Sequence, residues 1–116
     1  MPGGMDALLA SPLEAAEVIV SGSSALVVDT VPTTDFRALK YFVSFHNITQ
    51  DVAKYLEMNV VNENSSVSDS LSGKLGSSID VDTGAAISGS NLELTITNNE
   101  TYDVTVSLAK ITFGGG

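Results

Sequence analysis

The 116-residue chain contains no cysteine and no tryptophan, and its single histidine is His46. Without cysteine, disulfide bonds, thiolate nucleophiles and thiolate metal sites are excluded. A lone histidine also excludes a pair of imidazole ligands, and a histidine-based triad would have to be built around His46. The chain shows no phosphate-binding, dinucleotide-binding or nucleophile-elbow motif. We therefore expect no enzymatic activity, no cofactor and no metal, with His46 as an ordinary residue at a strand end.

Basic residues are scarce as well. Five Lys and Arg stand against 14 Asp and Glu, the formal net charge is -9, and the first base is Arg37. Such a chain repels nucleic-acid backbones and anionic membranes, so neither is expected as a partner. The N-terminus lacks the positive charges and apolar stretch of a secretory signal, and no apolar run approaches the roughly 20 residues of a membrane helix.

Hydrophobic residues are plentiful, at 43% of the chain, which is enough for one domain with a continuous core. Residues 1–24 are rich in Ala and Leu, and Ser11 followed by Pro12 predicts a short helical turn over residues 12–17. We interpret 1–24 as an N-terminal arm, because so short a helix must dock on something to be stable. Residues 25–113 form the expected sandwich domain, and the glycines at 114–116 form a flexible tail.

From residue 25 onward, apolar and polar residues alternate with a period of two, which is typical of strands. The expected strands are 26–31, 36–46, 52–61, 67–75, 78–81, 91–97 and 102–113. Polar and glycine-containing turns separate them, and no segment between them is long enough for a crossover helix. The predicted fold is all-β: a β-sandwich or jelly-roll-like domain of about seven to eight antiparallel strands.

The alternation also predicts which side chains face the core. These are Val52, Leu56, Met58 and Val60; Leu39, Tyr41, Val43 and Phe45; Leu92, Leu94 and Ile96; and Val104, Val106 and Leu108. Lys54 is the exception within its strand. Phe36 and Phe42 make the second face of their strand apolar, so that strand is expected to be central or covered.

Two local predictions concern the C-terminal strands. Asn98 and Asn99 are typical turn residues and predict a hairpin between 91–97 and 102–113. Ile111 and Phe113 have the opposite parity to Val104, Val106 and Leu108, which predicts a β-bulge near Ala109 and Lys110.

Two kinds of sequence motif are weak indications of calcium binding and of glycosylation. Asp80, Asp82 and Gly84 resemble the start of a calcium loop, but the distal Glu of such a loop is missing, so exposed acids at a strand end are the favoured interpretation. Asn47, Asn64 and Asn99 each begin a glycosylation acceptor pattern. Without a secretory signal, these asparagines are better explained as turn residues.

The stretch ALVVDTVPTTDFRALKYFVSF resembles a family of small β-sandwich structural proteins of tailed phages from marine and cyanobacterial hosts. The matching residues are Val28, Asp29 and Thr30, then Phe36, Arg37, Lys40 and Tyr41. The likeness continues through Asp80, Asp82, Ile87, Ser88, Gly89, Asn91, Leu92 and Leu94 to Val104 and Ile111. The middle of the chain departs from the family, because Asn62, Glu63 and Asn64 stand where an Asp-Gly turn is usual.

The resemblance implies a virion component assembled in the host cytoplasm. We expect a capsid decoration or cement protein that forms a homo-oligomer, a trimer, and binds the major capsid protein or other virion proteins. A tail, neck or fibre-adaptor protein is the alternative, and a carbohydrate-binding module is a remote one, because few aromatic residues are present for stacking on sugars. The expected interface residues are Leu8, Leu9, Leu13, Val18, Ile19, Phe36, Arg37, Lys40 and Phe42. Arg37 or Lys40 is expected to pair with Asp29, Asp35 or Asp82.

Overall fold

The computed structural model describes residues 14–63 and 66–114, and this part of the chain folds into eight antiparallel strands and one short 3-10 helix. The strands are β1 (Glu14–Val20), β2 (Ser24–Pro32), β3 (Ala38–Asn47), β4 (Val52–Glu63), β5 (Ser66–Gly76), β6 (Val81–Ser88), β7 (Asn91–Asn98) and β8 (Val104–Phe113), with the helix η1 (Thr33–Asp35) between β2 and β3. This confirms the predicted all-β class. No helix in the described ranges is long and apolar enough to cross a membrane.

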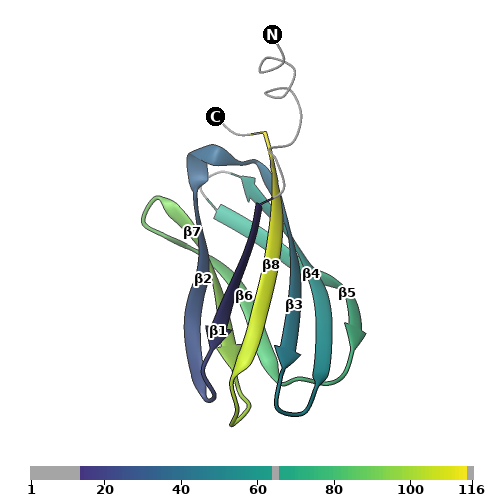
Figure 1. Cartoon of the computed structure of the whole chain (residues 1–116). Helices are drawn as coiled ribbons and strands as arrows, with labels where there is room; N and C mark the ends of the chain where they lie inside the picture. The colour runs from purple at the N-terminus through teal and green to yellow at the C-terminus, as the bar shows by residue number, and fades with distance from the viewer. Residues whose placement is uncertain (1–13, 64–65, 115–116) are drawn as a thin grey trace.

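Two sheets make up the sandwich (Figure 1). One has five strands in the order β1-β8-β3-β4-β5, and the other has three in the order β2-β7-β6. Hairpins connect β3 to β4, β4 to β5 and β6 to β7 within a sheet, whereas the chain crosses between sheets after β1, β2, β5 and β7. The smaller sheet has only three strands and does not cover β5, so nearly all side chains of β5 are exposed.

The core lies between the two inner faces. The predicted inward residues of β3, β7 and β8 are all buried, as are Leu56, Met58 and Val60 of β4, while Val52 packs against them partly buried. Phe36 and Ile79 enter the core from the segments that cross between sheets, and Val20, Val31 and Val81 enter it from β1, β2 and β6. Phe36 precedes β3 and turns inward, so the outer face of β3 carries Phe42 without it.

Residues 14–17 belong to strand β1, so the predicted helical turn is wrong from Glu14 onward; Pro12 and Leu13 lie outside the described residues. β1 pairs with β8 in continuous register, from Glu14 opposite Lys110 to Val20 opposite Val104. Those seven cross-strand pairs outweigh the weak local preference for helix. The expected strand at 78–81 is also wrong, since the strand begins at Val81 and runs on through Gly84 to Ser88.

The predicted hairpin at Asn98–Asn99 does not form. β7 pairs with β2 and β6, whereas β8 belongs to the other sheet and pairs with β1 and β3. The predicted bulge near Ala109 and Lys110 is absent too, because β8 keeps one register with both neighbours. The parity change has another cause: Lys110 is the inward residue, and Ile111 and Phe113 lie on the outer face.

Bulges occur instead in β2 and β5. In β2 one extra residue, Val28, separates the pairs Val27–Thr95 and Asp29–Leu94. In β5 the extra residue lies between Ser72 and Leu75, where Gly73 has a φ of 61°, a left-handed conformation that favours glycine. Each bulge reverses which face the following side chains occupy, with consequences for Asp29 and for Lys74.

Three buried asparagines hold the ends of the sandwich together. The Asn47 side chain bonds to Gln50 in the β3–β4 turn, and Asn62 Nδ2 donates to the carbonyl oxygens of Thr33 and Phe36. Asn98 Nδ2 donates to the carbonyl oxygens of Val20 and Tyr102. Asn62 and Asn98 thus satisfy backbone carbonyls where the regular sheet hydrogen bonds stop, whereas Asn47 accepts a hydrogen bond from the backbone N–H of Gln50.

Candidate functional site

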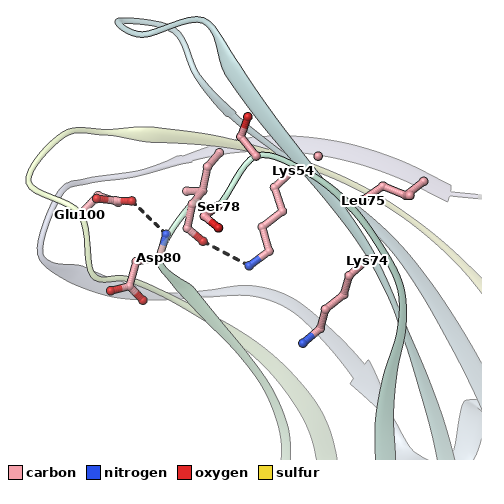
Figure 2. Close-up of a pocket in the computed structure, with 9 residues that line it drawn as sticks. Lys54, Lys74, Leu75, Ser78, Asp80 and Glu100 are labelled. Atoms are coloured by element: carbon pink, nitrogen blue, oxygen red, sulfur yellow. Dashed lines mark hydrogen bonds between the residues drawn. The ribbon is translucent and has the colours of Figure 1, made fainter.

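The segment that leads from β5 to β6 borders a hollow of about 640 Å³ (Figure 2). The residues that line it are Lys54, Lys74, Leu75, Gly76, Ser77, Ser78, Ile79, Asp80 and Glu100. It is comparable in size to small-molecule sites. Its lining is a mixture of cationic, anionic, hydroxyl and apolar groups from three parts of the chain.

Two lysines form one side of this hollow. Lys54 Nζ donates to the carbonyl oxygen of Ile79 at 3.1 Å and lies 6.0 Å from the ring centroid of Phe45. Lys74 follows the bulge at Gly73, and the shifted register places it on the same face of the sheet as Lys54, which is opposite Gly76. Without the extra residue, Lys74 would face the other side. Neither lysine forms an ion pair with any carboxylate in the described chain.

Two acids lie across from the lysines, as Figure 2 shows. Glu100 Oε2 accepts a hydrogen bond of 2.9 Å from the backbone N–H of Asp80, and Asp80 Oδ1 accepts one of 3.2 Å from Asn99 Nδ2. These bonds hold both carboxylates in place and leave each of them further acceptor positions. The hollow therefore presents hydrogen-bond donors on one side and acceptors on the other.

A second, flatter hollow of about 550 Å³ lies on the outer face of the five-stranded sheet. Its floor consists of small residues, among them Ser44, Ser107 and Ala109, and Phe42 and Tyr55 border it. Around it, Lys40 pairs with Glu57 at 2.9 Å, and the Tyr55 hydroxyl donates to Glu57 at 2.9 Å. The hydrogen bond from Lys40, and to a smaller extent the one from Tyr55, lowers the pKa of Glu57.

The expected interface residues occupy several different places. Leu8, Leu9 and Leu13 lie outside the described residues. Val18 packs partly buried against the core, and Phe36 is fully buried within it. Ile19, Lys40 and Phe42 all lie on the outer face of the five-stranded sheet, where Ile19 is well exposed. Arg37 is exposed just before β3.

The expected pairing of Arg37 or Lys40 with Asp29, Asp35 or Asp82 is wrong. Lys40 pairs with Glu57, because both project from the outer face of neighbouring strands. The bulge at Val28 turns Asp29 inward, where it binds the ammonium of Lys110 and the hydroxyl of Tyr41. No ion pair joins Arg37 to an acid within 14–63 and 66–114.

The structure also locates the weaker sequence motifs, namely His46, the two aspartates and the asparagines. His46 Nε2 lies 3.1 Å from Asp51 Oδ1 at the β3–β4 turn, where both side chains are exposed. Asn99 Nδ2 bridges Asp80 and Asp82, and the described residues contain no group of three or more potential metal ligands. Asn47 acts as a buried turn residue, which agrees with the turn interpretation of that motif.

Lys54 and Lys74 were not among the expected site residues. Lys54 does interrupt the apolar alternation of its strand, and Gly73 directly precedes Lys74. Both features are visible in the sequence, but only the register of β4 and β5 brings the two lysines to one hollow.

No protein-family model and no curated protein sequence matches the chain. Among solved structures, the chain is similar to part of the tailspike protein gp49 of Acinetobacter baumannii bacteriophage Fri1, a capsular polysaccharide depolymerase, with a TM-score of 0.46 and 16% sequence identity. The match covers 86% of this chain and 17% of the tailspike chain. The chain thus spans a small fraction of that protein, and the likeness concerns the path of the backbone alone.

Proposed function

We propose that this chain is a non-enzymatic structural β-sandwich of a tailed-phage virion, and that it binds other virion proteins through the outer face of its five-stranded sheet. The observation that carries the proposal is the apolar character of that face. Ile19, Val61, Leu75 and Phe113 project from it and are between 44% and 70% exposed. Val61 and Phe113 lie together at one end of this face, and clusters of exposed apolar residues mark protein interaction sites.

The register shows how this surface is built. Phe113, Ala38 and Val61 are direct cross-strand neighbours on β8, β3 and β4, and they form an apolar row at one end of the face. The small floor residues beside Phe42 leave a hollow that a partner side chain can fill. Lys40 and Glu57 on this face neutralise each other, and Glu17 adds one negative charge beside the hollow.

The virion assignment draws on the sequence resemblance. Two of the residues that carry the resemblance have a clear role in holding this fold together. Asp29 and Tyr41, which belong to its two most recognisable elements, join the two sheets by a hydrogen bond of 2.8 Å. The pattern is therefore tied to this sandwich. A tail, neck or fibre position and a decoration position on the capsid shell both make use of an apolar outer face.

Incorporation into particles tests the proposal. Val61→Lys places a charge on the outer face, whereas Val27→Lys makes the same change on the opposite sheet, where Val27 is exposed to a similar extent, 44% against 50%. We expect both variants to fold and only Val61→Lys to be missing from purified particles. Equal incorporation of the two, or absence of the wild-type chain from particles, would contradict the proposal. Cryo-electron microscopy of labelled particles then assigns the tail or the shell.

A further inference from the structure

We propose that the hollow between β4, β5 and the β5–β6 crossover binds an acidic saccharide, with a sugar carboxylate at Lys54 and Lys74 and sugar hydroxyls at Asp80 and Glu100. This inference concerns a different surface from the outer face above, and it holds wherever the chain sits on a particle. Three observations carry it: two unpaired lysines, a bulge that brings them together, and the acceptors opposite.

The first observation concerns charge. The chain has only five bases, yet two of them line one hollow without an ion-pair partner in the described residues, although acids outnumber bases by 14 to five. Lys54 is held in position by Ile79 and Phe45 and keeps two N–H donors for another group. Both ammonium groups are therefore available to an external anion.

The second observation is the bulge at Gly73. The extra residue moves Lys74 onto the face of Lys54, and it does so at an exposed edge strand with no core to pack against. Bulges in strands commonly re-aim a side chain next to a binding site. Gly73 adopts the left-handed conformation that this arrangement requires.

The third observation selects the class of anion. Asp80 and Glu100 would repel an acidic peptide that entered the hollow, and inorganic phosphate has few protons to donate to them. Sugar hydroxyls donate to carboxylates and accept from hydroxyls such as those of Ser77 and Ser78. The Leu75 side chain points away from this hollow, to the outer face of the sheet, so the polar groups alone determine the choice of ligand. An acidic saccharide uses the ammonium, carboxylate and hydroxyl groups at once.

A glycan-binding screen with the full chain tests the inference. The probes are uronate-, sialate- and pyruvate-bearing oligosaccharides, their neutral counterparts, a poly-aspartate peptide and inorganic phosphate. We expect binding to at least one acidic saccharide and none to its neutral counterpart. Amide resonances of Gly76, Ser77 and Ser78 should shift on binding. Failure of every acidic saccharide, or equal binding of the peptide or phosphate, would overturn the inference.

Lys74→Gln is the decisive variant, because Lys74 is exposed on the edge strand β5 and its loss should leave the fold intact. We expect it to weaken saccharide binding by about tenfold or more, since a hydrogen bond to a charged group is lost. Lys40→Gln is the matched control, with the same charge change on the outer face. Equal weakening by both substitutions would show a general charge effect and would also contradict the site. Lys74→Gln leaves Lys40, Val61 and Phe113 on the outer face unchanged, so particle incorporation of this variant remains a separate test of the structural role.

Discussion

The ammonium group of Lys110, on β8 of the five-stranded sheet, lies 2.9 Å from Oδ2 of Asp29, on β2 of the three-stranded sheet. Tyr41, the direct cross-strand neighbour of Lys110, donates its hydroxyl hydrogen bond to the same oxygen. The lysine and aspartate side chains are only 11% and 19% exposed. One carboxylate thus joins two strands of one sheet to the other sheet, inside an otherwise apolar core.

Asp29→Ala should destabilise the fold strongly, because it leaves the Lys110 ammonium and the Tyr41 hydroxyl buried without their shared acceptor. We expect a loss of about 3 kcal/mol in the free energy of unfolding, as for other broken buried ion pairs. Urea denaturation at neutral pH measures it. Asp51→Ala, at a side chain that is 94% exposed, is the control and should change stability little. A similar loss in both variants would contradict the inter-sheet role of Asp29.

Titration of the Tyr41 hydroxyl should lower the stability of the fold in alkaline solution. Burial, together with the hydrogen bond to Asp29 and its charge, raises the pKa of Tyr41 above its ordinary value of 10. The stability gained from the protonated hydroxyl is therefore fully present below pH 10 and is lost as the pH rises toward the folded-state pKa. The wild-type protein should lose about 1 kcal/mol from this group between pH 10 and pH 11, and the slope approaches about 1.4 kcal/mol per pH unit only above pH 11.

Urea midpoints between pH 7 and pH 11 test this prediction. Tyr41→Phe should cost about 1 kcal/mol at neutral pH through the lost hydrogen bond, and its alkaline decline should be shallower than that of wild type. Tyr55→Phe is the comparison: the pKa of Tyr55 is raised as well, by burial and by Glu57, but on the outer face, so its removal should flatten the alkaline decline less than removal of the Tyr41 hydroxyl. If Tyr41→Phe and wild type decline in parallel, the assigned titration is wrong.

Glu57 should titrate below its ordinary pKa of 4.5, since it accepts hydrogen bonds from Lys40 and Tyr55. Its charged form then stabilises the fold above pH 4.5, and this contribution disappears as the pH falls through the lowered pKa. Carboxyl-carbon NMR measures the midpoint directly. In Lys40→Gln the midpoint should rise toward 4.5, whereas Lys74→Gln, on the other side of the sheet, should leave it in place.

Asn98 should contribute far more to the stability of the fold than the neighbouring Asn99. Its buried amide donates to Val20 and Tyr102, and its oxygen accepts from the N–H of Glu100, at the point where the chain crosses from β7 to β8. Asn98→Ala leaves these backbone groups unsatisfied, and we expect a loss of about 2 kcal/mol in thermal or urea denaturation. Asn99→Ala removes exposed bonds to Asp80 and Asp82 and should cost much less.

The inward-facing residues could be predicted from the sequence alone. Leu92, Leu94 and Ile96 are all buried as their alternation predicts, because a strand places every second side chain on the same face whatever its partner. The same reasoning failed at Lys110, where apolar parity suggested a bulge. There the core contains an ion pair, and an inward lysine is indistinguishable from an outward one by sequence.

Sheet partners, by contrast, depended on contacts distant in sequence. The strands on either side of Asn98 alternate apolar and polar residues as the strands of a hairpin would, yet they belong to different sheets. β8 pairs instead with β1 and β3, which are distant from it in the sequence. Nothing local distinguishes a hairpin turn from a crossing between sheets. The proposed site has the same origin, because Lys54 and Lys74 meet only through the shifted register of β4 and β5.

The sequence by itself determined the all-β class, most strand positions and the core faces, because these follow from a period of two that each strand carries locally. It also determined the shortage of bases and of catalytic side chains. The tertiary structure alone decided the five-and-three division of strands, the strand character of Glu14–Val20 and the partner of Asp29. The physical reason is that hydrogen bonds and ion pairs between strands depend on which segments meet in space.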